Sequence, residues 1–256
     1  MRLSAAIFLI LNFCGAGLLA DGGIYGEANH GKYVFEFIKN VASDDREAIA
    51  RKTSFPLRRE YPLPSIENRE EFLKRYDEVF DSTLRKQIAA SNFAKDWASV
   101  GWRGIMFGRG VVWLDIDGSL RALNYQSEAE RKKRALLIEQ DKSSLYPAIR
   151  EFVKPTLIME TAKHRIRIDN MGENKWRYVA WPINAKMSDK PDLILCDGAR
   201  VFEGSGGNHY YKFKNGSFTY QCGINVIGSD ETPPAELTVY KGDRVILEEN
   251  AKVLRN

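Results

Sequence analysis

Three histidines are the residues best suited to acid–base chemistry beyond residue 20: His30, His164 and His209. An acid–base histidine needs a partner that fixes its tautomer and a pocket that tunes its pKa. Only His209 follows a glycine-rich loop, a setting common to functional sites. If the protein is an enzyme, we therefore expect His209 to act with Glu203 or Asp197. The alternative is an ordinary histidine at the start of a strand.

The other two histidines are poorer candidates. His164 lies in residues 163–167, which alternate as a strand and place its polar face toward solvent. His30 ends a glycine-flanked lead-in, residues 21–30, which we expect to be loose. No nucleophile elbow of the Gly-x-Ser-x-Gly type is present in the sequence. Under the hypothesis that the protein is not an enzyme, we name no catalytic residue.

Four aromatic residues suggest a place for a small apolar ligand. They are Trp97, Trp102, Phe107 and Trp113. They occur on or beside predicted strands, where they can line a concave apolar pocket. The alternative is plain core packing, because aromatic residues favour half-buried strands.

Two cysteines remain beyond residue 20, Cys196 and Cys222. In an oxidising compartment such a pair predicts one disulfide. Two free buried thiols are the alternative. Neither cysteine has a second histidine or cysteine at ligand spacing, so we expect no metal site. The glycine-rich residues 203–207 lack the lysine and the following helix of a phosphate loop, and we expect no cofactor.

The charge balance excludes a nucleic-acid partner. The chain has 38 Lys plus Arg against 34 Asp plus Glu, a formal charge of +4. A nucleic-acid binder needs a clustered basic patch. The densest basic run, residues 131–134, is flanked by glutamates and is typical of a solvated helix face.

Residues 1–20 read as a signal peptide. Arg2 is followed by an apolar run from Ala5 to Leu11, and the segment ends in Ala20, where we expect cleavage. We expect a periplasmic or secreted protein with no later transmembrane segment. Lipidation at Cys14 is not expected, because Phe13 is large where lipoproteins carry a small residue.

The periodicity predicts helices first and strands afterwards. Residues 33–41, 68–80 and 81–88 carry helical apolar faces, with caps expected at Asn68 and Asp81. From Trp97 to Asn124 the pattern becomes a β-meander, with Asp117-Gly118 as a hairpin turn. Residues 126–152 are charged and predicted to be helical.

Nine candidate strands follow the charged segment. They are residues 156–161, 163–169, 175–181, 192–196, 199–203, 209–213, 217–222, 235–240 and 244–248. The fold class is therefore α+β, with N-terminal helices packed on a curved antiparallel meander and a mostly antiparallel C-terminal part. We divide the chain into a signal peptide (1–20), an α+β domain (21–125), a charged helical linker (126–152) and a β-rich domain (153–256).

Residues 31–124 resemble the nuclear transport factor 2-like superfamily. The likeness lies in Ser54-Phe55-Pro56-Leu57, in Asn68 to Phe80, and in Gly104 to Trp113. The resemblance implies a cone-shaped α+β fold with a pocket between helices and sheet, as in exported bacterial proteins. It implies no particular activity, because that superfamily contains both enzymes and binding modules.

Two functional hypotheses follow from the sequence. The first is an exported, soluble binding protein whose partner is another exported protein, which it sequesters or neutralises, or a small apolar ligand. The second is a small-molecule enzyme, a hydrolase or lyase, that uses a histidine and a carboxylate in the pocket. The absence of a catalytic motif favours the first.

Overall fold

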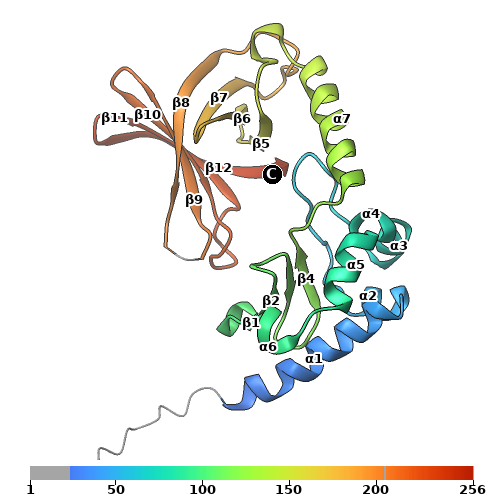
Figure 1. The fold of residues 1–256 in the computed structure, drawn as a ribbon. Coiled ribbons are helices and arrows are strands. Elements are labelled where there is room, and N and C mark those ends of the chain that lie inside the picture. The colour runs from blue at the N-terminus through green and yellow to red at the C-terminus, as the bar shows by residue number, and fades with distance from the viewer. Residues whose placement is uncertain (1–23, 205, 256) are drawn as a thin grey trace, which may run out of the picture.

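The computed structural model describes residues 24–204 and 206–255. Helices and a small sheet form the N-terminal α+β region, residues 24–125, and the remaining strands form a barrel (Figure 1). The predicted α+β class and the antiparallel C-terminal part are confirmed. The predicted signal peptide and Cys14 lie outside the described residues. None of the described helices is long and apolar enough to cross a membrane.

The α+β region places its helices on one face of a four-stranded antiparallel sheet. Its elements are α1 (Ile24–Ala42), α2 (Arg46–Arg51), α3 (Arg69–Lys74), α4 (Tyr76–Val79), α5 (Ser82–Ala89), α6 (Phe93–Asp96), β1 (Trp97–Ser99), the 3-10 turn η1 (Gly101–Arg103), β2 (Ile105–Phe107), β3 (Val112–Leu114) and β4 (Leu120–Leu123). Val34 and Phe37 of α1 pack with Trp97 and Phe107 of the sheet. Helix α1 begins at Ile24, so the expected loose lead-in at residues 21–30 is wrong from that residue onward.

The local signals read from the sequence act as predicted at the helix starts. Asn68 accepts a hydrogen bond from the Glu71 amide at 2.9 Å, and Asp81 accepts one from the Leu84 amide at 2.9 Å. Each bond satisfies an amide that the first turn of a helix leaves without a partner. The Asp117-Gly118 turn also forms, with Gly118 at a φ of 83°.

The C-terminal strands close into an antiparallel barrel, β10-β11-β12-β5-β6-β7-β8-β9. Its strands are β5 (Lys154–Glu160), β6 (His164–Gly172), β7 (Lys175–Pro182), β8 (Leu193–Phe202), β9 (His209–Asn215), β10 (Phe218–Ile224), β11 (Ala235–Lys241) and β12 (Arg244–Arg255). Closure comes from β12, whose C-terminal part pairs with β5 at Lys252↔Glu160. It removes the exposed edges that an open sheet would present.

Side chains fill the barrel interior, as expected for this number of strands. Trp176, Tyr178 and Phe213 are among the buried inward-facing residues. The predicted strands 192–196 and 199–203 are one strand, β8, which bends where Asp197 adopts a φ of 57°. The next residue must be glycine, because a Cβ on Gly198 would lie 2.1 Å from the Phe213 ring. Trp176, Tyr178 and Phe213 therefore pack as a core inside the barrel.

The outer face of the barrel is not a solvated face at β6 and β7. Helix α7 (Glu128–Ser144) and the 3-10 turn η2 (Pro147–Ile149) cover it, and Arg167 and Asp169 are fully buried. Asp169 accepts from Arg167 Nε and from Arg177 Nη2, each at 2.7 Å. Asp141 of α7 accepts from both terminal nitrogens of Arg167, at 3.1 and 2.6 Å.

This cover reverses the predicted orientation of His164. His164 has the same strand parity as Ile166 and Ile168, which face the barrel interior. Its Nδ1 lies 3.8 Å from Glu249 Oε2, and Glu249 is 13% exposed. The His164 side chain is 38% exposed, so it keeps contact with solvent as predicted, but it lies on the inward face of the strand and not among the arginines that α7 covers.

A second buried ion pair joins α7 to the α+β region. The side chains of Arg59 and Glu130 are 1% and 0% exposed. Arg59 donates to both carboxylate oxygens of Glu130 and to the backbone oxygen of Leu123. Helix α7 lies in the segment predicted as a charged linker, and these contacts attach it to both neighbouring regions.

The two cysteines are free in the structure, in contrast to the predicted disulfide. Cys222 is buried in the barrel interior, whereas Cys196 is exposed on β8. Strand β9 lies between β8, which carries Cys196, and β10, which carries Cys222. The residue that pairs with Cys222 on β9 is Tyr211. A strand spacing of about 4.8 Å puts the two backbones too far apart for a disulfide. Burial raises the pKa of the Cys222 thiol well above its ordinary value.

We predict that Glu130→Ala destabilises the protein strongly. The substitution leaves the Arg59 guanidinium buried without its carboxylate partner, which costs about 3–5 kcal/mol in comparable cases. Urea unfolding should show this loss. Lys132→Ala, on the exposed face of the same helix, should unfold at the wild-type urea concentration within error. Equal midpoints for the two variants would contradict the assigned role of the buried pair.

We predict two thiols of very different reactivity in protein that begins near Asp21. Cys196 should react with a thiol reagent at once, and Cys222 only after unfolding, because burial and a raised pKa keep it as an inaccessible thiol. Cys196→Ser should remove the fast phase and leave the slow one. If unreduced protein shows no reactive thiol after unfolding, the two cysteines form the disulfide after all and this prediction is wrong.

Candidate functional site

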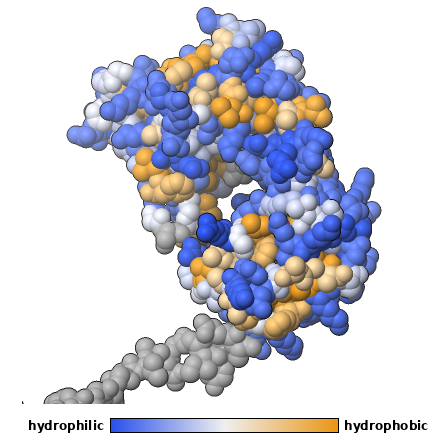
Figure 2. Space-filling model, viewed as in Figure 1, coloured by the Kyte–Doolittle hydropathy of each residue, from blue (hydrophilic) through white to orange (hydrophobic). Residues whose placement is uncertain are grey.

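A cleft separates the barrel from the α+β region, and Figure 2 shows the molecule hollowed between these two lobes. Three cavities of about 400, 380 and 380 Å³ lie in this part of the molecule. The first and third have lining residues from both lobes, and the second is lined only by residues of segments 58–60 and 123–126. The first and second share Arg58, Arg59 and Glu60, and the second and third share Asn124. We call these three neighbouring cavities together the interlobe cleft. Its size is typical of small-molecule sites.

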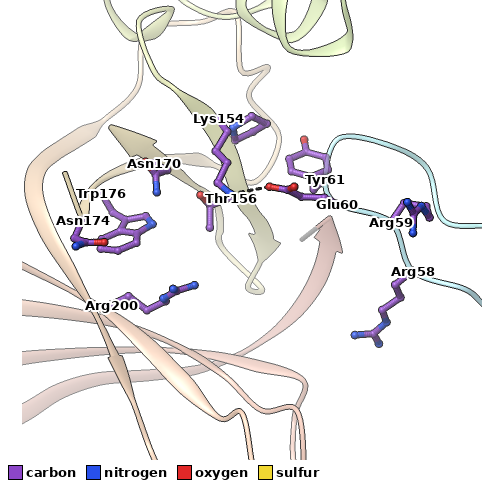
Figure 3. A pocket seen from close by; sticks show the side chains of 11 residues that line it. Arg58, Arg59, Glu60, Tyr61, Lys154, Thr156, Asn170, Asn174, Trp176 and Arg200 are labelled. Carbon is purple, nitrogen blue, oxygen red and sulfur yellow. Dashed lines mark hydrogen bonds and ion pairs between the residues drawn. The ribbon is translucent and has the colours of Figure 1, made fainter. Parts of the chain in front are cut away.

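The first cavity has a polar, basic lining (Figure 3). The loop before Tyr61 forms one wall, and the ends of β5 to β8 form the other. Its lining residues are Arg58, Arg59, Glu60, Tyr61, Lys154, Pro155, Thr156, Asn170, Asn174, Trp176 and Arg200. Four of these side chains are cations and one is a carboxylate, so the cavity carries a surplus of positive charge.

The single carboxylate, Glu60, is already neutralised. Its Oε1 lies 2.7 Å from Lys154 Nζ and 3.0 Å from Arg134 Nη2, and its Oε2 accepts from Gln126 at 2.9 Å. Partial burial acts to raise the Glu60 pKa, but these partners outweigh it and lower the pKa. Glu60 stays ionised and tied to Lys154, so neither group is free to bind a ligand.

Arg58 and Arg200 have no carboxylate partner among the described residues. Figure 3 shows them extending from opposite walls toward the space between the lobes. The Arg200 guanidinium lies over the Trp176 ring at 5.5 Å and over the Phe202 ring at 4.7 Å. Cation–π contacts of this kind orient a guanidinium and leave its charge in place. The two arginines can therefore meet an anion from two sides.

Polar groups beside the arginines are also available. The Thr156 hydroxyl oxygen is buried and has no hydrogen-bond partner among the described residues. A buried hydroxyl without a partner is costly, and a ligand that bonds to it recovers that cost. Asn174, held at a φ of 57° in the β6–β7 turn, presents an amide to the same cavity. Two neutral polar side chains thus line the same cavity as the two arginines.

The four aromatic residues predicted to line one pocket lie on two sides of the sheet. Trp97 and Phe107 are 6% and 7% exposed on the helix-covered face, with ring centroids 5.0 Å apart. Trp113 faces the opposite way, because its neighbours Val112 and Leu114 are in the core. Trp113 and the exposed Trp102 line the third cavity. The structure therefore brings two of the four to the cleft.

The residues named for a possible enzyme are not assembled around His209. Its Nδ1 donates to the Gly207 backbone oxygen at 2.9 Å, and its ring contacts Phe202 and Tyr211. Asp197 is 74% exposed and pairs with Lys175 at 3.2 Å. Glu203 is exposed, and no ion pair or hydrogen bond joins it to His209 within the described ranges. His209 thus has an orienting carbonyl and no orienting carboxylate.

Sequence reasoning missed Arg58, Thr156 and Arg200. One signal was available, because Arg200 and Phe202 share a face of the same strand and an arginine beside an aromatic ring often marks a recognition surface. Arg58 and Thr156 carry no such pattern. Their role depends on the packing of two regions that lie about a hundred residues apart in sequence.

No protein-family model, curated protein or solved structure matches this chain. The resemblance of residues 31–124 to the nuclear transport factor 2-like superfamily therefore stays a prediction. What the protein does has to be inferred from the chemistry of the interlobe cleft.

Proposed function

We propose that this chain is an exported binding protein that holds an organic anion in the interlobe cleft. One observation carries the proposal: Arg58 and Arg200 face a cavity of about 400 Å³ from opposite walls, without a carboxylate partner among the described residues. Arginine is the side chain best suited to carboxylate and phosphate, because its planar fork donates two parallel hydrogen bonds. Thr156 and Asn174 add neutral donors, and Trp176 adds a ring for stacking.

A small anion fits better than a protein partner. The two cations lie in a recess between the lobes, whereas a docking protein needs contacts spread over a projecting surface. Export remains part of the proposal and rests on the N-terminal sequence. The enzyme alternative is less well supported, since His209 has no carboxylate partner in the described structure and does not line the first cavity.

The proposal predicts specific binding of phenyl phosphate, a dianion that carries an aromatic ring. Arg58→Ala and Arg200→Ala should each weaken binding tenfold or more, because a hydrogen bond to a charged group contributes about 1.5–3 kcal/mol. Arg244→Ala, an exposed arginine on the β11–β12 hairpin, removes the same charge and should change the dissociation constant less than about twofold. Isothermal titration calorimetry gives all four constants.

Circular dichroism should show that each variant stays folded, since Arg58 and Arg200 are exposed residues. Arg200→Lys should bind with intermediate affinity, because it keeps the charge and loses the fork. If the Arg58 and Arg200 variants bind phenyl phosphate as the wild type does, the cleft is not the anion site and the proposed function is wrong.

The same probe separates binding from catalysis. We expect no release of phosphate above the buffer rate, and we expect His209→Ala to bind phenyl phosphate within about threefold of wild type. A general acid or base contributes about a hundredfold or more to a rate. Phosphate release that His209→Ala reduces by that factor, in a folded variant, would establish the enzyme in place of the binding protein.

A further inference from the structure

The interlobe cleft does not end at the two arginines. Its third cavity, of about 380 Å³, lies between the sheet of the α+β region and two loops of the barrel. It is lined by Trp102, Arg103, Trp113, Arg121, Ala122, Asn124, Gly206, Gly207, Val226 and Ile227. Most of its apolar lining is exposed in the structure: Trp102, Val226 and Ile227 are 69%, 56% and 53% exposed. Large apolar side chains gathered on one exposed surface typically mark a binding site.

The barrel side of this apolar end is held in place by hydrogen bonds. Asn208 Oδ1 accepts from the amides of Val226 and Ile227 at 2.8 and 2.9 Å. Its Nδ2 donates to the Ile227 backbone oxygen at 2.9 Å. The Ile227 side chain also packs directly over Gly206, where a Cβ would lie 2.1 Å from Ile227 Cδ1. The two apolar side chains are therefore presented by an ordered pair of loops.

The opposite side is the sheet face that the helices leave uncovered. Trp113 of β3 pairs with Ala122 of β4 and with Met106 of β2, and all three side chains share that face. Trp102 of η1 extends the same surface. An aromatic wall thus faces the aliphatic tip formed by Val226 and Ile227 across the cleft.

The anion end and the apolar end are linked by shared lining residues. The middle cavity shares Arg58 with the first and Asn124 with the third, and Asn124 is fixed by donating to the Gly110 backbone oxygen at 2.7 Å. On the barrel side, β8 leads from Arg200 through Phe202 toward Gly206 and Gly207. The shared residues and the run of β8 make the two ends neighbours along the cleft.

We propose that the ligand is an amphipathic anion: a phosphate or carboxylate head between Arg58 and Arg200, with an apolar chain between the Trp102–Trp113 wall and the Val226–Ile227 tip. This inference rests on the proposed function and adds the chemical class of the ligand. A compact anion would leave the apolar surface in water, whereas an apolar chain removes that surface from water. A purely apolar ligand would leave the two cations without a partner.

Two series of probes test the chain and the head separately. Monoalkyl phosphates and alkanoates, each with one, four, six and eight carbons in the chain, are titrated by calorimetry below their critical micelle concentrations. Burial of a methylene contributes about 0.8 kcal/mol, so affinity should rise up to about fourfold for each added carbon. The series that binds more tightly at equal chain length identifies the head as phosphate or carboxylate.

Two variants locate the chain. Trp102→Ala and Ile227→Ala remove exposed side chains, so the fold should persist. Each should weaken binding of the eight-carbon probe about tenfold and leave the one-carbon probe within about twofold. Ile246→Ala is the matched control for Ile227→Ala, because Ile246 is 48% exposed on β12 and lines none of the three cavities.

The outcomes separate this inference from the function on which it rests. If the one-carbon probes bind through Arg58 and Arg200 but added carbons bring no affinity, the amphipathic ligand is wrong and the anion site remains. The same conclusion follows if the eight-carbon probe binds tightly and neither Trp102→Ala nor Ile227→Ala weakens it. If no probe of either series depends on the arginines, the proposed function itself fails.

Discussion

Helix α7 is held by buried charge at both of its ends, and the geometry of the interlobe cleft depends on that attachment. Glu130 and Ile138 are its only buried residues, so apolar packing alone cannot fix its position. Glu130 pairs with Arg59 of the α+β region, and Asp141 pairs with Arg167 on the barrel. Ion pairs of this kind have strict geometry, because desolvated charges are stable only when their hydrogen bonds are all made. The helix thereby joins two regions in one relative position.

The Arg59–Glu130 pair also orients the neighbouring arginine. Arg59 points into the protein, where it binds Glu130 and the Leu123 backbone oxygen. Arg58 lies in an extended segment beside the Leu57↔Ile66 bridge, so its side chain points the opposite way, into the cleft. Two adjacent arginines thus have different functions: one is neutralised to hold the fold, and the other keeps its charge. An interaction that reads as purely structural therefore sets the position of a proposed binding residue.

Local sequence signals predicted most of the elements, because they depend on a few neighbouring residues. The caps at Asn68 and Asp81, the Asp117-Gly118 turn and the strands of the C-terminal part all follow from short patterns. Closure of the barrel does not follow from short patterns, since it depends on pairing between β12 and β5, which lie at opposite ends of the C-terminal sequence. The strand face of His164 was predicted wrongly, although its parity with Ile166 and Ile168 could be read from the sequence. Strand alternation shows that two faces differ, but only tertiary packing decides that the face with Arg167 is covered by α7.

The candidate site was harder to predict than the fold for the same physical reason. Trp102 and Trp113 were identified as ligand contacts, but the pattern grouped them with Trp97 and Phe107, which face the core. Arg58, Thr156 and Arg200 come from segments that only the packing of the two lobes brings together. A binding site needs charge, donors and apolar surface in fixed positions, and these come from segments far apart in the sequence.

The unpaired charges in the cleft favour a binding role on energetic grounds. Arg58 and Arg200 have no ion pair among the described residues, whereas Lys154 beside them is paired with Glu60. Arg200 is held against Trp176 and Phe202, contacts that restrict its side chain and leave its charge in place. Restricting the arginine before a ligand arrives lowers the conformational entropy lost on binding. The same holds for the loops around Val226 and Ile227, which Asn208 fixes in place. A preorganised binding site requires exposed side chains and loops that are held in one conformation before the ligand binds.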